Sequence, residues 1–101
     1  MVVITFRSRL RDEFLDEYNE TALKMLALAR EMPGFVSFNS YTAEDGERIS
    51  VIEFETEEHV TAWRNHPEHR TAQQLGREKF YAEYHLSVSK TLRSYSFEYG
   101  G

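Results

Sequence analysis

The sequence predicts an α+β fold of the ferredoxin-like type, in which an antiparallel sheet carries its helices on one face. Three observations lead to this fold class. Apolar residues change between strand-like and helix-like spacing in the order β-α-β-β-α-β. Pro33-Gly34 ends the first helical pattern, and Asp45-Gly46 separates two strand patterns as a tight turn would.

The first strand is predicted over Val2 to Ser8, where a β-branched run passes into alternating apolar and polar residues. A long amphipathic helix is predicted next, from about Arg9 to Met32. Pro33 cannot donate the next helical hydrogen bond, and Gly34 accepts the left-handed conformation that is common after a helix end. The helix is therefore expected to stop at this pair. Its apolar positions recur at steps of three or four, at Phe14, Tyr18, Ala22, Met25, Ala29 and Met32.

Two antiparallel strands are predicted to follow, over Phe35 to Thr42 and over Arg48 to Glu55. The acidic segment between them contains Asp45-Gly46, a pair that supplies the positive backbone angles of a tight hairpin. Thr56 can then cap a second helix, whose first turn carries carboxylates that complement free backbone N–H groups.

The second helix is predicted to be split in two. Val60 and Trp63 are expected to point inward from its first part. Pro67 fits badly inside a helix but well at a first helical position. A break at Asn65-His66 and a new helix from Pro67 are therefore expected.

The last strand is predicted from Tyr84 to about Tyr99, with a bulge or bend between Lys90 and Arg93, where the apolar parity switches. Several strands carry apolar residues at both parities, so both faces of the sheet need burial. Helices can cover only one face, and packing two sheets against each other in a homodimer would cover the other. Residues 95–101 are expected to form a C-terminal extension or a segment exchanged between the subunits.

Length and composition exclude several classes of protein. The 101 residues fit a single domain, 1–101, because either half of a divided chain would bury too little apolar surface. A net charge of -5 argues against a nucleic-acid partner, and the absence of cysteine excludes disulfides and thiolate sites. Neither a signal segment nor an apolar run of about 20 residues is found, so a cytoplasmic protein without a membrane partner is expected.

Side chains capable of chemistry concentrate between Trp63 and Tyr84. Glycine inside a helix costs about 0.8–1.0 kcal/mol relative to alanine. Gly76 therefore indicates either close packing of helix on sheet or room for a ligand. Trp63 is likewise either a core aromatic or a flat wall for a planar ligand. The helix that begins at Pro67 is expected to present one stripe of residues to this space, namely His69, Ala72, Gln73, Gly76 and Phe80.

His69 is the candidate general base, because the positive end of the helix dipole favours a neutral, proton-accepting imidazole in the first helical turn. A capping or surface histidine is the alternative. His66 and His69 could also be metal ligands, but no carboxylate or thiolate set with ligand spacing accompanies them. Arg77 would stabilise an oxyanion or lie exposed beside a glutamate. Asn39 is a candidate polar anchor.

The chain resembles the antibiotic biosynthesis monooxygenase family of dimeric α+β barrel proteins over nearly its whole length. The motifs that carry the resemblance are Met32-Pro33-Gly34-Phe35, the acidic hairpin, Glu53-Phe54 ahead of the helix with Trp63, His66-Pro67-Glu68-His69, Gln73, Gly76-Arg77 and Phe80-Tyr81. The resemblance implies two subunits packed sheet to sheet, each with a pocket between sheet and helices. It also implies oxygenation of phenols, quinols or polyketide aromatics, often without metal or flavin. Haem-degrading relatives use an Asn on the first strand, which this chain lacks, so haem degradation ranks lower.

The leading hypothesis is a homodimeric, cofactor-independent monooxygenase that acts with dioxygen on a small aromatic or quinol-type substrate. A deprotonated, electron-rich aromatic can itself give an electron to dioxygen, so the protein need supply only a base, anion stabilisation and a dry pocket. The alternatives are a non-catalytic module that binds a small aromatic or lipid-like ligand, and a stress or interaction protein that uses only the dimer. The hypothesis assigns His69 as base, Trp63 as wall, and substrate contacts to Asn39, His66, Gln73, Gly76, Arg77 and Phe80.

Overall fold

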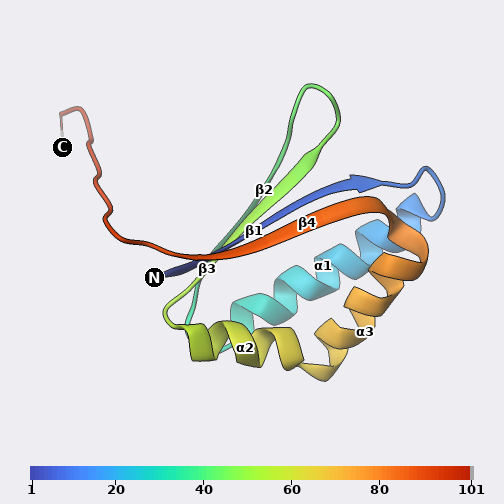
Figure 1. Ribbon diagram of the computed structural model, residues 1–101, viewed down its shortest axis with the longest axis horizontal. Helices are drawn as coiled ribbons and strands as arrows, with labels where there is room; N and C mark the ends of the chain where they lie inside the picture. Colours follow the sequence, from blue (N-terminus) through green and yellow to red (C-terminus); the bar gives the residue numbers. More distant parts are fainter. Residues whose placement is uncertain (101) are drawn as a thin grey trace.

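A computed structural model describes residues 1–100 and shows one antiparallel sheet with its helices on one face (Figure 1). The strands lie in the order β2-β3-β1-β4. This arrangement confirms the predicted ferredoxin-like α+β fold. The elements are β1 Val2–Leu10, α1 Leu15–Glu31, β2 Phe35–Thr42, β3 Arg48–Phe54, α2 Glu57–Asn65, α3 Pro67–Leu75, a π-helical turn η1 Gly76–Phe80, and β4 Tyr81–Lys90.

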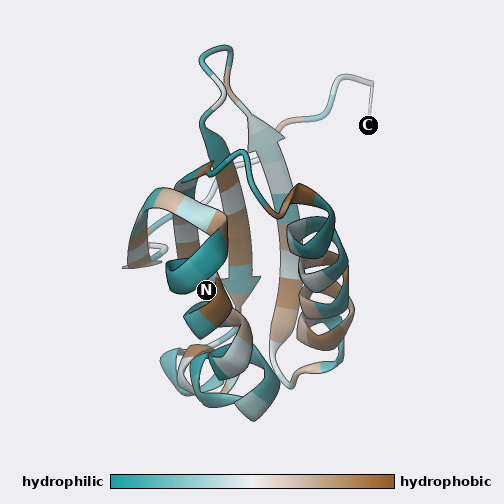
Figure 2. Cartoon of the chain, turned by 90° about the vertical axis from the view of Figure 1, so that its right-hand side faces the viewer, coloured by the Kyte–Doolittle hydropathy of each residue, from teal (hydrophilic) through white to brown (hydrophobic). Residues whose placement is uncertain are grey.

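The core lies between the two central strands and the helices. Val2 pairs with Phe54 and Ile4 pairs with Ile52, so these four side chains share the face that the helices cover. The strands in Figure 2 are accordingly banded with apolar and polar residues. The buried cluster consists of Val2, Ile4, Ala29, Ile52, Phe54, Val60 and Trp63.

Local stop and cap signals act as predicted. The helix α1 ends at Glu31, and Gly34 follows with a φ of 78°, in the left-handed region. Thr56 caps α2, its side-chain oxygen accepting a hydrogen bond from the His59 backbone N–H at 3.2 Å. α2 breaks at His66, and Pro67 opens α3. None of the helices within residues 1–100 is both long and apolar enough to cross a membrane.

The predicted start of the first helix is wrong. Helix α1 begins at Leu15 rather than near Arg9, because β1 continues to Leu10 and remains paired with β4. Phe14, which fitted the helical spacing, instead lies exposed just before the helix with a φ of 60°. The pairing of β1 with β4 shifts register between Arg9 and Leu10.

The predicted last strand is also wrong in extent. β4 begins at Tyr81 and ends at Lys90. Lys90 pairs with Val2, the first residue of β1, so the pairing of the two strands ends there. Beyond that point the chain has no neighbouring strand to pair with, and residues 91–98 form no strand. The expected bulge near Lys90 to Arg93 is therefore absent, and the tail leads away from the domain (Figure 1).

Gly76 is buried where α3 passes into η1, and the structure supports the close-packing interpretation. A Cβ atom at this position would lie 2.6 Å from Cε2 of the Tyr81 ring. That ring is held on several sides, with centroid distances of 5.3 Å to Phe6, 6.0 Å to Tyr18 and 5.8 Å to Tyr84. The ring therefore has little freedom to move away.

Replacing Gly76 by alanine is expected to destabilise the fold by about 1–2 kcal/mol, because overpacking outweighs the gain in helix propensity. Urea unfolding would measure the loss. In a Tyr81→Leu background the same replacement should cost little, since the ring is gone. A Gly76→Ala protein more stable than the parent would contradict the close contact.

Candidate functional site

Trp63 and His69 form a stacked pair at the junction of α2 and α3. Their ring centroids are 3.9 Å apart and their planes are inclined by 14°. Trp63 is only 3% exposed, whereas His69 is half-buried. The pair forms because α2 ends at Asn65 and Pro67 begins a new helix, which brings the first turn of α3 back over the end of α2.

The hydrogen bonding of His69 fixes its tautomer. Its Nδ1 lies 3.0 Å from the backbone oxygen of Trp63, and a carbonyl oxygen can only accept, so Nδ1 carries the hydrogen. The lone pair of the neutral ring is therefore on Nε2. Within residues 1–100 no side chain or backbone group forms a hydrogen bond with that atom. His69 thus offers a free proton acceptor.

Burial lowers the pKa of His69, and the neighbouring charge of His66 acts in the same direction, while the hydrogen bond to the Trp63 oxygen opposes both. The imidazole is therefore neutral at pH 7 and able to take a proton. Gln73 lies beside it, with Nε2 3.3 Å from Nδ1 of His69 and donating to the backbone oxygen of Arg64 at 3.1 Å. The structure brings together the predicted residues Trp63, His69 and Gln73.

The helix-facing side of β4 is left uncovered. Leu86 pairs with Phe6 and Val88 pairs with Ile4, so both point to the side of the sheet on which the helices lie. They are nevertheless 51% and 50% exposed. Ile4 belongs to the same buried cluster as Trp63, so Val88 flanks that cluster. Together with Tyr84 on the same side of the strand, these residues form an open apolar wall on the side of the sheet where the helices lie.

Three other predicted site residues have structural roles. His66 caps α3, its Nδ1 accepting a hydrogen bond from the backbone N–H of Glu68 at 3.2 Å. Phe80 is buried and packs edge-on against Tyr18, with centroids 5.6 Å apart. Gly76 packs against Tyr81, as described above. Within residues 1–100 no group of three or more His, Asp or Glu side chains is placed to hold a metal ion.

Two predicted residues lie away from the pair. Asn39 opposes Val51, and strand parity puts both on the face of the sheet opposite the buried Ile52. Within a single chain Asn39 therefore lies on the other side of the sheet from Trp63. Arg77 is exposed and lines a polar groove on α2 and α3, without the glutamate partner that was the alternative.

Comparison with known proteins identifies the family. A sequence model described as antibiotic biosynthesis monooxygenase matches residues 1–75. The chain belongs to this family. Uncharacterized protein YqjZ of Bacillus subtilis (strain 168) is 34% identical over 91 residues, which cover 90% of this chain and 80% of YqjZ.

Solved structures of low sequence identity share this fold. Rv0793 from Mycobacterium tuberculosis has a TM-score of 0.82 at 18% identity, covering 94% of this chain and 98% of that one. An N-to-A variant of SnoaB, described as a cofactor-independent oxygenase from Streptomyces nogalater, has a TM-score of 0.78 at 12% identity, covering 92% and 94%. At these identities the likeness establishes the fold.

The apolar wall is the part of the candidate site that sequence reasoning missed. Tyr84, Leu86 and Val88 alternate with polar residues, and this signal correctly predicted a strand. Their exposure depends on which neighbour β4 has and on how far the helices extend. That information comes from the sheet order, in which β4 is an edge strand.

Proposed function

We propose that this member of the antibiotic biosynthesis monooxygenase family oxidises a small quinol-type aromatic with dioxygen, without a metal or an organic cofactor. The observation that carries the proposal is the Trp63–His69 pair, in which Nδ1 is committed to a backbone oxygen and Nε2 is free. A neutral base and an apolar wall on the same side of the sheet are groups that activation of a phenol can use.

In the proposed reaction Nε2 of His69 removes the proton of a substrate hydroxyl, and the ring of the resulting phenolate gives electrons to dioxygen. One oxygen atom forms a bond to a ring carbon, which loses its hydrogen, and the second oxygen leaves as water. A quinol plus dioxygen thus becomes a hydroxyquinone plus water. The substrate supplies all the electrons, so no further reductant is needed.

The wall and the indole have a physical role in this reaction. Leu86, Val88 and Tyr84 offer apolar surface on which a flat ring can lie, and removing water there strengthens any charge interaction with the phenolate. The Trp63 indole stacks on the His69 imidazole and restricts the orientation of its ring. The description of SnoaB as a cofactor-independent oxygenase supports the same class of reaction.

The test is oxygen uptake by metal-free protein. The purified chain, treated with a chelator, would be incubated with a panel of hydroquinones and naphthohydroquinones, aerobically and anaerobically. We expect substrate-dependent uptake and product formation only with oxygen. A panel that binds to the protein but is never consumed faster than in protein-free buffer would favour the alternative of a binding module.

We also propose that the chain is a homodimer in which residues 95–101 contribute to the contact. The sheet face away from the helices carries Val3, Ile49 and Val51, which no helix within residues 1–100 covers. Apolar side chains of the tail are 86% to 95% exposed, at Leu92, Tyr95, Phe97 and Tyr99. The last three alternate with polar residues, a pattern typical of a half-buried strand.

Removal of residues 95–101 is therefore expected to weaken the dimer more than about tenfold, because each buried aromatic contributes about 1.5–3 kcal/mol. Sedimentation at a series of concentrations measures the change. A Ser94→Ala, Ser96→Ala variant keeps the three aromatic side chains and serves as the control. A full-length chain that sediments as a monomer throughout would contradict the proposal.

A further inference from the structure

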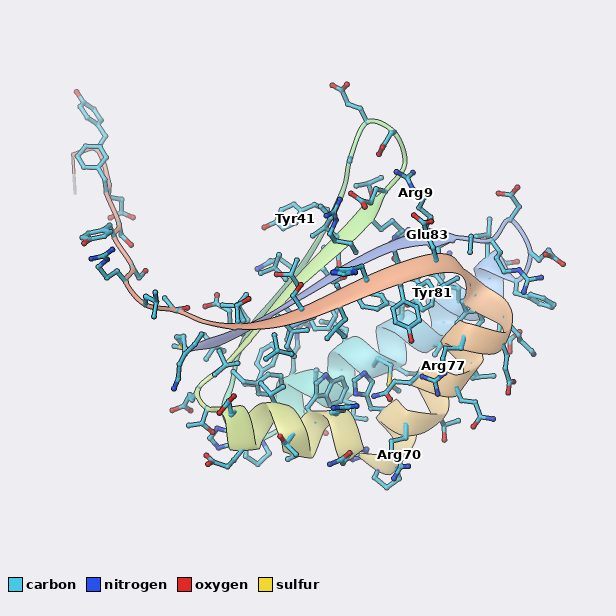
Figure 3. All side chains as sticks on the ribbon, viewed as in Figure 1. Arg9, Tyr41, Arg70, Arg77, Tyr81 and Glu83 are labelled. Atoms are coloured by element: carbon cyan, nitrogen blue, oxygen red, sulfur yellow. The ribbon has the colours of Figure 1, made fainter. Side chains whose placement is uncertain are left out.

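A groove on the helical side of the molecule collects positive charge in an otherwise acidic protein. Arg64 comes from the end of α2, Arg70 from α3 and Arg77 from η1, and all three line one cavity of about 430 Å³. Arg70 and Arg77 are seven residues apart, which is two helical turns, so they share a side of the helix. Figure 3 shows Arg70 near the start of α3 and Arg77 near its end.

The lining of this arginine groove contains no carboxylate. Its remaining residues are uncharged hydrogen-bonding side chains, namely Asn65, Thr71, Gln73 and Gln74. Glu78 is not among the lining residues, and its carboxylate lies beside the groove, where it accepts a hydrogen bond from Nε2 of Gln74 at 2.9 Å. The groove is therefore positive, although the whole chain carries a net charge of -5.

Within the described part of the chain, the three guanidinium groups have no ion-pair or hydrogen-bond partner. Arg7, Arg9 and Arg11 each form an ion pair with a carboxylate. Among residues 1–100, by contrast, no carboxylate lies within 4.0 Å of the Arg64, Arg70 or Arg77 guanidinium groups, and none of the three donates a side-chain hydrogen bond. Like charges collected in one concavity repel one another, and a bound anion would relieve that repulsion.

Guanidinium chemistry indicates which anion fits. Each planar guanidinium group can donate two parallel hydrogen bonds to two oxygens of a phosphate. Three such groups together suit an anion that has several oxygens and at least two negative charges. The side-chain amide of Asn65 adds a neutral donor at the same surface. The volume falls within the range of small-molecule sites, which is about 300–1,000 Å³.

We propose that the arginine groove binds a small molecule that carries a phosphate or pyrophosphate group. This site is separate from the apolar wall and does not depend on the proposed oxygenation. Gln73 connects the two regions, because its side chain lines the groove while its Nε2 lies 3.3 Å from Nδ1 of His69. A ligand in the groove would therefore be separated from the proposed base, His69, by the Gln73 side chain.

The test is titration calorimetry of the full chain with inorganic pyrophosphate at constant ionic strength. We expect saturable binding, one ion per chain, with a dissociation constant below about 1 mM. Arg70→Gln and Arg77→Gln should each weaken binding at least tenfold. Arg30→Gln, which removes the same charge from the exposed end of α1, should change it less than twofold.

The outcomes separate the proposal from simpler explanations. Equal weakening by Arg30→Gln would show a general charge effect and would overturn the site, as would the absence of saturable binding. Citrate that binds as tightly as pyrophosphate would overturn the phosphate assignment. Pyrophosphate binding is measured without quinol or turnover, so a failure of the oxygenase proposal would leave this result intact.

Discussion

Replacement of His69 by alanine is expected to lower kcat by about 10²–10⁴-fold while ligand affinity changes little, because a general base contributes a factor of that size. The imidazole stacks on the Trp63 ring, and within residues 1–100 nothing forms a hydrogen bond with its proton-accepting nitrogen. Steady-state oxygen uptake gives kcat, and binding of a non-oxidisable quinol analogue gives affinity. Added imidazole should restore part of the lost activity by occupying the vacated space.

The matched control is His66→Asn. Asparagine is a strong N-cap, so it preserves the cap of α3 while removing the second imidazole. This variant should keep kcat within about twofold if His69 alone is the base. Turnover that survives in His69→Ala would refute the base assignment and direct attention to the binding alternative.

The pH dependence follows from the same assignment. The base is active when neutral, so kcat/KM falls on the acid side as the imidazole becomes protonated. Because burial lowers the pKa of His69, this acid limb should lie below the ordinary histidine value of about 6.5. In the pH profile of the residual activity of His69→Ala, this acid limb of kcat/KM should disappear.

Replacement of Trp63 by alanine is expected to destabilise the domain by about 3–5 kcal/mol, because a buried aromatic is lost from a packed cluster. The Trp63 side chain is almost fully buried and belongs to the same buried cluster as Val2, Ile4 and Phe54. The backbone oxygen of Trp63 also lies within hydrogen-bond distance of His69. Urea unfolding monitored by circular dichroism measures the loss of stability. Tryptophan fluorescence cannot be used, because Trp63 is the only tryptophan and the variant lacks it.

Trp63→Phe is the control for this prediction, because it keeps a flat ring and most of the volume and should cost less than about 1.5 kcal/mol. If Trp63→Ala leaves too little folded protein to measure, Trp63→Leu gives an intermediate loss in the same assay. Unfolding of the alanine variant at the parent's urea midpoint would show that the indole is not part of the core.

Local signals in the sequence predicted the order of the elements. Pro33-Gly34 and Pro67 act through missing hydrogen bonds and backbone angles, which are properties of a few neighbouring residues. The two errors concern elements whose limits depend on distant partners. β1 continues into the predicted helix because β4 pairs with it, and β4 stops at Lys90 because β1 begins at Val2.

The site divides along the same line. Trp63 and His69 could be predicted as a pair because Pro67 lies between them and breaks the helix. The tautomer of His69 depends on a backbone oxygen whose position no spacing reveals. The face on which Asn39 lies could not be predicted, because strand parity can be assigned to a face only after β2 is registered against β3. Arg70 was not selected at all, since its importance arises only where α2 and α3 meet.

The most direct test of the proposed oxygenation is the stoichiometry of oxygen consumption by metal-free protein with a limiting amount of quinol. Insertion of one oxygen atom with release of water predicts one dioxygen consumed per quinol and no hydrogen peroxide, so catalase added at the end returns no oxygen. Simple oxidation of quinol to quinone would release hydrogen peroxide. In that case catalase would return half of the oxygen consumed, and monooxygenation would be contradicted.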